Sequence, residues 1–85
     1  MKIYYSSKFE KEYQALSKEI KEKATMREKI FRRDPFDQRL KTHKLKGILS
    51  GFWAFSIDYQ YRIIFEFRDK KTAWFHSVGT HEIYR

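Results

Sequence analysis

GFWAFSIDYQYRIIFEF, residues 51–67, is the stretch of this sequence that decides its fold. Large apolar residues occupy every second position on either side of a polar break at 58–60. A two-residue repeat is typical of strands that bury one face and leave the other to solvent. Because the break is only three residues long, we expect the two strands to lie side by side and antiparallel.

The alternation also divides the side chains between the two faces of the sheet. If Phe55 and Ile63 point into a core, then Ser56 and Arg62 point the other way. The neighbours follow the same rule, with Trp53, Ile57, Tyr61 and Phe65 inward and Ala54, Asp58, Ile64 and Glu66 outward. The pattern therefore places Arg62 on an open face, where it can meet a ligand.

The remaining strands come from both ends of the chain. A polar turn at 68–71 leads into a third strand over 72–78, and residues 3–5 form an edge strand. Residues 7–33, in contrast, carry apolar side chains at helical spacing. One unbroken helix of that length would measure about 40 Å. A domain of this size has a diameter of only about 30 Å, so we expect the helical segment to fold back.

Local signals divide this segment into two helices. We expect a break at Ser17, which caps the second helix. Ser7 and Glu10 form a capping box at the start of the first helix, and Pro35 ends the second. The predicted fold is α+β with the order β-α-α-β-β-β, in which a helical hairpin packs on one face of a mainly antiparallel four-stranded sheet. Residues 1–85 are expected to form a single domain.

Composition narrows the location and the partners of the protein. Eight Phe, six Tyr and two Trp supply a dense core, and no Cys is present to form disulfides. No apolar run resembles a signal peptide or reaches the roughly 20 residues of a membrane span, so we expect a cytoplasmic protein. A net charge of +8 attracts polyanions. Nucleic acid is the first candidate and an acidic membrane surface the second, with a generic basic protein as the plain alternative.

Three histidines are candidates for chemistry, because imidazole exchanges protons near neutral pH, as RNA cleavage requires. His76 lies inside a predicted strand, where packing or a structural hydrogen bond is the simpler role. His81 follows the end of that strand, a position that favours function. His43 belongs to a basic loop, residues 39–47, that suits either a phosphate backbone or a solvated surface. The histidine spacing matches no metal site, and we expect no metal and no cofactor.

Three segments carry a resemblance to a known family. LKGILSGFW (45–53) is similar to a segment of YoeB-type toxins, YRIIF (61–65) to the arginine-bearing strand of the RelE superfamily, and GTHEIYR (79–85) to the close of RelE and YafQ relatives. With the element order, the resemblance covers nearly the whole chain. It implies a RelE-like toxin of a toxin–antitoxin system, an endoribonuclease that cleaves messenger RNA on the ribosome through attack of the 2′-hydroxyl on the adjacent phosphate.

The resemblance also implies roles for individual residues. Arg62 corresponds to the arginine that binds the scissile phosphate, and His81 to the general acid. His43 is a candidate general base, and Tyr84 an aromatic residue that orients the substrate. The loop lacks the catalytic glutamate of YoeB, so the division of acid and base between the two histidines stays open. RNA contacts are expected from Lys41, Lys44, Lys46 and Arg85.

Other functions share this fold. A ParE-like gyrase poison binds without cleaving, a basic adaptor binds ribosomal RNA, and a toxin can keep its fold after losing activity. His43 and His81 favour the nuclease over the gyrase poison, which has no need of acid and base groups. The resemblance further implies a cognate antitoxin, and the charge of +8 makes an acidic segment of that partner the natural complement. We expect this segment near Arg62 and the basic loop.

Overall fold

A computed structural model describes the backbone of residues 1–84 and the side chains of residues 1–83. The roles expected for the Tyr84 side chain and for Arg85 therefore lie outside the described residues. The elements in chain order are β1 (Lys2–Tyr5), α1 (Ser7–Gln14), α2 (Lys18–Arg33), the short 3-10 helix η1 (Gln38–Leu40), β2 (His43–Lys44), η2 (Gly47–Leu49), β3 (Trp53–Ser56), β4 (Arg62–Asp69), β5 (Thr72–Gly79) and η3 (His81–Tyr84).

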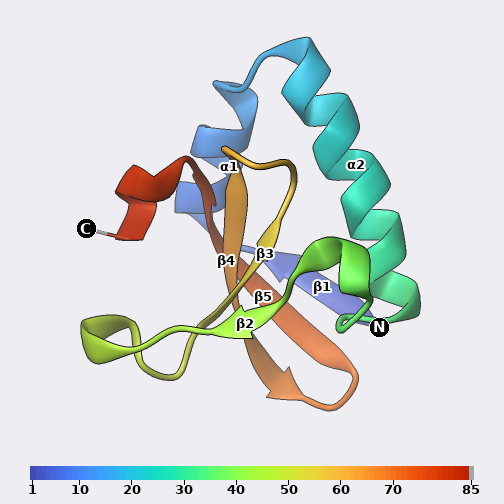
Figure 1. Cartoon of the computed structure of the whole chain (residues 1–85), viewed down its shortest axis with the longest axis vertical. Coiled ribbons are helices and arrows are strands. Elements are labelled where there is room, and N and C mark those ends of the chain that lie inside the picture. Colours follow the sequence, from blue (N-terminus) through green and yellow to red (C-terminus); the bar gives the residue numbers. More distant parts are fainter. Residues whose placement is uncertain (85) are drawn as a thin grey trace.

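The strands form one sheet in the order β1-β5-β4-β3-β2 (Figure 1). Only β1 runs parallel to its neighbour, and the other pairs are antiparallel. The α+β prediction is confirmed, with one difference, because the sheet has five strands and not four. The extra strand is β2, two residues of the basic loop that pair with Ala54 and Trp53. Its two side chains are both exposed, so no alternation in the sequence reveals it.

The helical segment breaks where the sequence predicts. Ser17 caps α2, its Oγ accepting a hydrogen bond from the Ile20 amide at 3.3 Å. The helix ends before Pro35, with Asp34 in an extended conformation. The cap predicted for α1 is wrong by one residue. Ser6, not Ser7, accepts from the Phe9 amide at 2.9 Å, because Ser6 keeps the extended backbone of β1 while Ser7 is already helical.

The core lies between the two helices and one face of the sheet. Phe31 of α2 stands at its centre, with its ring 5.0 Å from the rings of Phe55 and Phe65 and 5.3 Å from that of Phe75. All four side chains are fully buried. Truncating a buried Phe to Ala typically costs about 3–5 kcal/mol. The packing confirms the inward set of side chains, since Phe55, Ile57, Ile63 and Phe65 all belong to this core.

The opposite face of the sheet is less open than the alternation suggests. Ile64 is only 4% exposed, and with Leu49, Phe52 and Ile83 it lines a hollow of about 260 Å³. The loop before β3 and the 3-10 helix after β5 thus cover the middle of this face. The face that the alternation predicts to be open is therefore covered in its middle, because burial by a loop or a terminal segment leaves no periodic signal. Arg62 lies at the end of the face, at the first residue of β4.

Candidate functional site

The structure brings together the two residues for which the strongest roles are expected. Arg62 is paired with Gly79 across the antiparallel strands β4 and β5, and His81 follows two residues later at the start of η3. The Nη2 atom of Arg62 lies 3.4 Å from Nε2 of His81. The first residue of a β-hairpin lies beside its last residue, because the two strands run antiparallel. The side chains of Arg62 and His81, 19 positions apart in the chain, therefore meet at one edge of the sheet.

The guanidinium of Arg62 is incompletely paired. Its Nη1 atom is buried and has no hydrogen-bond partner among the described residues. A guanidinium presents five N–H donors in a fixed fork and stays charged at any physiological pH. Buried polar groups are normally hydrogen-bonded, and an exception calls for an explanation. An oxyanion such as a phosphate, which accepts paired N–H bonds, matches this fork.

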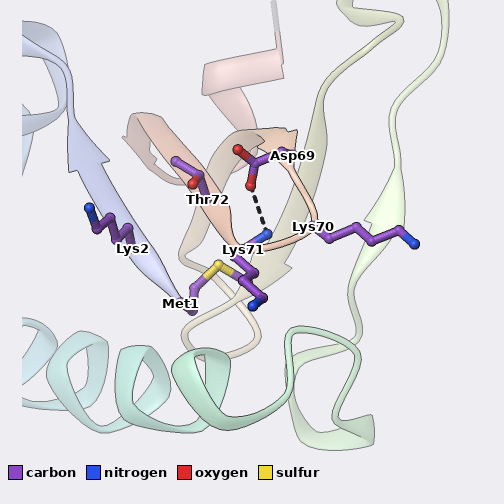
Figure 2. Close-up of a pocket in the computed structure, with 6 residues that line it drawn as sticks. All are labelled: Met1, Lys2, Asp69, Lys70, Lys71 and Thr72. Atoms are coloured by element: carbon purple, nitrogen blue, oxygen red, sulfur yellow. Dashed lines mark hydrogen bonds between the residues drawn. The ribbon is translucent and has the colours of Figure 1, made fainter.

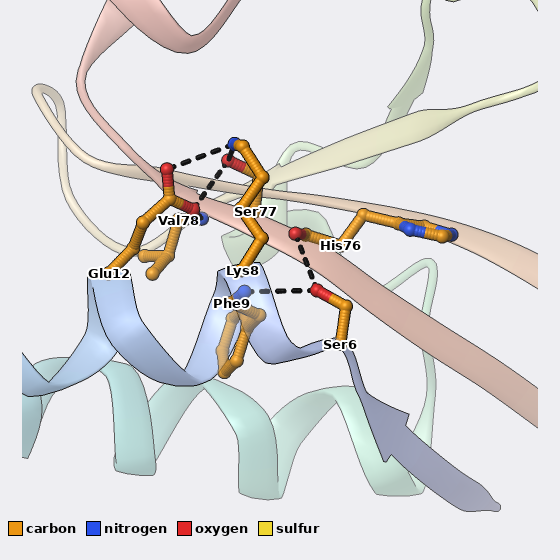
Figure 3. Close-up of polar contacts among 7 residues, drawn as sticks. All are labelled: Ser6, Lys8, Phe9, Glu12, His76, Ser77 and Val78. Atoms are coloured by element: carbon orange, nitrogen blue, oxygen red, sulfur yellow. Dashed lines mark hydrogen bonds and ion pairs between the residues drawn. The ribbon is translucent and has the colours of Figure 1, made fainter.

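A polar cluster ties α1 to the strand that leads to His81 (Figure 3). Oε1 of Glu12 accepts hydrogen bonds from the Ser77 hydroxyl at 2.8 Å and from the Val78 amide at 3.1 Å. The Lys8 ammonium donates to both Glu12 Oε2 at 3.0 Å and Ser77 Oγ at 2.9 Å. Partial burial raises the pKa of the Glu12 carboxyl, but the hydrogen bonds from Ser77, Lys8 and Val78 outweigh it and hold the pKa below its usual value. The carboxylate thus anchors the end of β5.

His43 shares the face of Arg62 but lies two strands away. It is paired with Ala54, and Ser56, two residues further along β3, is paired with Arg62. Paired residues and residues two apart point to the same side of a sheet. Two strand spacings separate β2 from β4 by about 10 Å. Nδ1 of His43 lies 3.0 Å from the Lys41 carbonyl, which orients the imidazole.

The three lysines of the basic loop that are expected to bind RNA do not lie together in the structure. Lys41, the residue before Thr42 and β2, has a positive φ of 52° and lies beside Arg62 at the same edge of the sheet. Lys44 points to the other face, where its ammonium lies 5.7 Å from the centre of the Trp53 ring. Lys46 is exposed at the start of η2. Of the three lysines expected to bind RNA, only Lys41 shares a pocket with Arg62.

That pocket, of about 210 Å³, contains residues that the sequence reasoning missed. Arg27 of α2 donates from Nη1 to the carbonyl of Arg39 at 2.7 Å, which joins the helix to η1. Arg39 in turn holds Asp37 through two side-chain hydrogen bonds of 2.9 Å, and these lower the pKa of Asp37 to about 2. The sequence carries no signal for this grouping, because Arg27 is one of many charged residues on α2. The lining is Arg27, Arg39, Lys41, Ser56, Asp58, Tyr59 and Arg62.

His76 is packed, as its place in a strand suggests. It is the extra residue at an irregularity in the β4–β5 pairing, where Ile64 faces Ser77 but Phe65 faces Phe75. Its ring stacks on Trp74 at 5.3 Å and meets Phe52 edge-on at 5.0 Å. Its Nε2 is buried and lies 3.3 Å from Oε1 of Glu66 without forming a hydrogen bond. His76 therefore belongs to the packing of the sheet and not to the edge that carries Arg62.

A larger hollow of about 630 Å³ lies at the other end of the sheet (Figure 2). It surrounds the tight turn between β4 and β5, in which the Lys71 amide donates to Oδ1 of Asp69 at 2.8 Å. The length of β4 separates it from Arg62 by about 23 Å. Among residues 1–83, none with an expected role lines it. Its lysine side chains spread apart, with Lys70 pointing away from the rest.

Within residues 1–84, no helix is long and apolar enough to cross a membrane. Over the same residues, His, Asp and Glu side chains form no group of three that could hold a metal ion. At the Arg62 edge a guanidinium lies beside an imidazole, and further cations line the adjoining pocket.

Comparison with known proteins identifies the fold. No protein-family model and no curated protein matches the sequence, but solved structures do match. The YoeB/ParE toxin from Agrobacterium tumefaciens has a TM-score of 0.80 at 21% identity, covering 95% of this chain and 99% of that one. YafQ from E. coli also has a TM-score of 0.80 at 21% identity, with 96% and 94% covered. The YoeB-YefM complex from Staphylococcus aureus reaches 0.77 at 22% identity, with 95% and 97% covered. This chain has the fold of the RelE/YoeB/YafQ-type toxins.

Proposed function

We propose that this chain is a single-domain toxin of a toxin–antitoxin system, an endoribonuclease that cuts messenger RNA on the ribosome without a metal or cofactor. The observation that carries the proposal is the approach of Arg62 Nη2 to His81 Nε2 at 3.4 Å. It joins a permanent cation to a group that exchanges protons near neutral pH. Phosphodiester cleavage uses a cation to stabilise developing charge and titratable groups to move two protons.

In the proposed reaction, a base removes the proton of the 2′-hydroxyl and the 2′-oxygen attacks the adjacent phosphorus. The bond from phosphorus to the 5′-oxygen breaks, and that oxygen receives a proton from an acid. The products are a 2′,3′-cyclic phosphate, or its opened form, and a 5′-hydroxyl. Arg62 binds the oxygens of the phosphorane, His81 is the general acid, and His43 is the candidate base. The reverse assignment of the two histidines gives the same products.

The contact between Arg62 and His81 has a consequence for this chemistry. A guanidinium can only donate, so Nε2 of His81 directs a lone pair toward it in the unliganded protein. When phosphate oxygens take the Arg62 donors, they replace Nε2 as the acceptor. The imidazole then lies next to the bound phosphate, where the proposed acid is needed.

The proposal includes the partners that the sequence suggests. The substrate is messenger RNA positioned by the ribosome, with Lys41, Lys44, Lys46 and Arg85 as RNA contacts and Tyr84 orienting the substrate. A cognate antitoxin with an acidic segment binds the toxin in the cytoplasm. The solved neighbours include YoeB with YefM and the E. coli DinJ-YafQ toxin-antitoxin complex, which supports a protein partner of this kind.

The test is primer extension on an abundant messenger RNA after brief induction of the chain in bacterial cells. Wild type is compared with Arg62→Ala, with His81→Ala and with Lys29→Ala, a control that removes an exposed cation of α2. We expect new 5′ ends inside reading frames for wild type and the control. The two active-site variants should produce few or none at matched protein levels.

The other outcomes distinguish the alternatives. Growth arrest without new 5′ ends would indicate a binding poison of the ParE kind. Neither arrest nor new ends would indicate an adaptor or an inactive toxin. New ends at the wild-type level in His81→Ala would show that His81 is not the acid.

A further inference from the structure

The pocket beside Arg62 gathers cations from three parts of the chain. Arg27 comes from the middle of α2, Lys41 from the residue next to η1, and Arg62 from the start of β4. Asp58, the one acidic residue of the lining, is already engaged, since its Oδ1 accepts from the amides of Gln60 and Tyr61 at 2.8 Å. The pocket therefore presents a net positive surface to an incoming anion.

An exposed aromatic ring stands at the rim of the same pocket. Tyr59, in the turn between β3 and β4, is 84% exposed. Two hydrogen bonds from backbone amides to the Asp58 carboxylate hold the turn that carries it. A third hydrogen bond runs from the Ile57 amide to the Tyr61 carbonyl at 2.9 Å. Because the turn is held in place, its backbone loses little conformational freedom when the ring stacks on a planar group. Nucleic-acid bases are planar groups that stack on aromatic side chains in this way.

The pocket adjoins the proposed reaction centre. Arg62 belongs to both, because Nη2 approaches His81 while the side chain also lines the pocket. Figure 1 shows η3 on one side of the start of β4 and the β3–β4 turn on the other. Lys41 lines the same pocket as Arg62. A strand of RNA with its scissile phosphate at Arg62 can thus place its next nucleotide in the pocket.

We propose that this pocket binds the nucleotide adjacent to the scissile phosphate, with its phosphate on Arg27 and Lys41 and its base stacked on Tyr59. The identity of the ligand as single-stranded RNA rests on the proposed nuclease function. Cations that follow the backbone and an aromatic ring that takes any base are the usual components of single-strand binding. The subsite holds and positions RNA, and it has no part in proton transfer.

The test is direct binding, measured by fluorescence anisotropy at low salt. The probe is a labelled eight-nucleotide RNA of mixed sequence with 2′-O-methyl groups, which the proposed reaction cannot cleave because it needs a free 2′-hydroxyl. Tyr59→Ala is matched with Tyr4→Ala, which removes an exposed ring from the opposite edge of the sheet. Lys41→Ala is matched with Lys29→Ala.

We expect Tyr59→Ala to weaken binding about tenfold, as loss of one stacked base does. Lys41→Ala should weaken binding and also reduce the slope of log affinity against log salt by about 0.7, the value for one phosphate contact with a single strand. The two control variants should bind as wild type does. Arg27→Ala should weaken binding similarly, with circular dichroism as a check because Arg27 also bonds Arg39.

Equal binding by Tyr59→Ala, Lys41→Ala and their controls would overturn the subsite, as would failure of the wild type to bind the probe at low salt. The measurement does not depend on cleavage. If the chain binds the probe through Tyr59 and Lys41 but produces no new 5′ ends in cells, the subsite proposal stands and the nuclease proposal fails. If cleavage depends on Arg62 and His81 but not on Tyr59, the nuclease proposal stands and the subsite proposal fails.

Discussion

The side chain of Ile83 fills the space next to Gly79, so that a Cβ atom added to Gly79 would lie 2.5 Å from Cγ2 of Ile83. This contact seats η3 on the end of β5 and sets where His81 lies, since His81 stands between the two residues in the chain. The methyl group belongs to a β-branched side chain with little rotational freedom. A larger residue at Gly79 must therefore shift the Ile83 side chain, which packs η3 on the end of β5.

We predict that Gly79→Ala reduces RNA cleavage while the fold is retained. Displacement of a catalytic group by about 1 Å can cost about 10²-fold in rate, and single-turnover cleavage on programmed ribosomes measures it. Ile83→Ala in the same chain removes the clashing methyl group and should restore part of the rate. Wild-type cleavage by Gly79→Ala alone would mean that η3 does not position the acid.

Arg62→Ala is expected to abolish growth arrest and leave the structure intact. The residue lies at the end of the far face, outside the core, so its loss opens no core cavity. Circular dichroism should match wild type. Arg62→Lys keeps the charge but loses the planar fork that binds phosphate oxygens in pairs, and it should recover little of the activity. An unfolded Arg62→Ala protein would show a structural role instead.

His43→Ala should slow single-turnover cleavage by the same factor as His81→Ala or by less. General acid or base groups typically contribute 10²–10⁴-fold. The imidazole of His43 is oriented by the Lys41 carbonyl on the face of Arg62, which is consistent with a base that acts once RNA is bound. Ribosome binding by both variants should stay near the wild-type level. An unchanged rate in His43→Ala would assign the base elsewhere.

The stability of the protein should depend on pH through Glu12. Its pKa is lowered in the folded protein, so the carboxylate stabilises the fold above its unfolded pKa of about 4.5 and loses this effect as the pH falls through the folded value. We expect Glu12→Gln to lower the free energy of unfolding at pH 7 by about 1–2 kcal/mol. Urea denaturation from pH 7 to pH 3 should show the gap to wild type closing below about pH 4.5. A gap that is constant with pH would exclude this linkage.

The proposed partner can be tested through its gene and its charge. We expect a small adjacent open reading frame whose product has an acidic segment, and whose co-expression relieves growth arrest. The +8 charge should accelerate association by long-range attraction, so the association rate should fall with salt. The complex itself should survive moderate salt, because exposed ion pairs supply little of the affinity. A chain tolerated alone at high level would argue against a toxin that needs an antitoxin.

Local patterns in the sequence determined much of this protein. The alternation of 51–67 predicted the antiparallel pair and the inward side chains, and Ser17 and Pro35 marked the limits of α2. These features depend on residues close in sequence, whose conformational preferences act whatever the rest of the chain does. Local signals failed where two segments compete for one residue. Ser6 follows β1 with an extended backbone and caps α1, and its hydroxyl also donates to the His76 carbonyl in β5, a contact that no local pattern announces.

Only the tertiary structure decided the composition of the site. Arg62 meets His81 because β4 and β5 pair in one register, and Arg27 reaches Lys41 and Tyr59 because α2 packs beside η1. Strand β2 exists because β3 offers an edge to a loop with no strand pattern of its own. These contacts join residues far apart in the chain, and their geometry follows from the packing of the whole core and not from the preferences of any one segment.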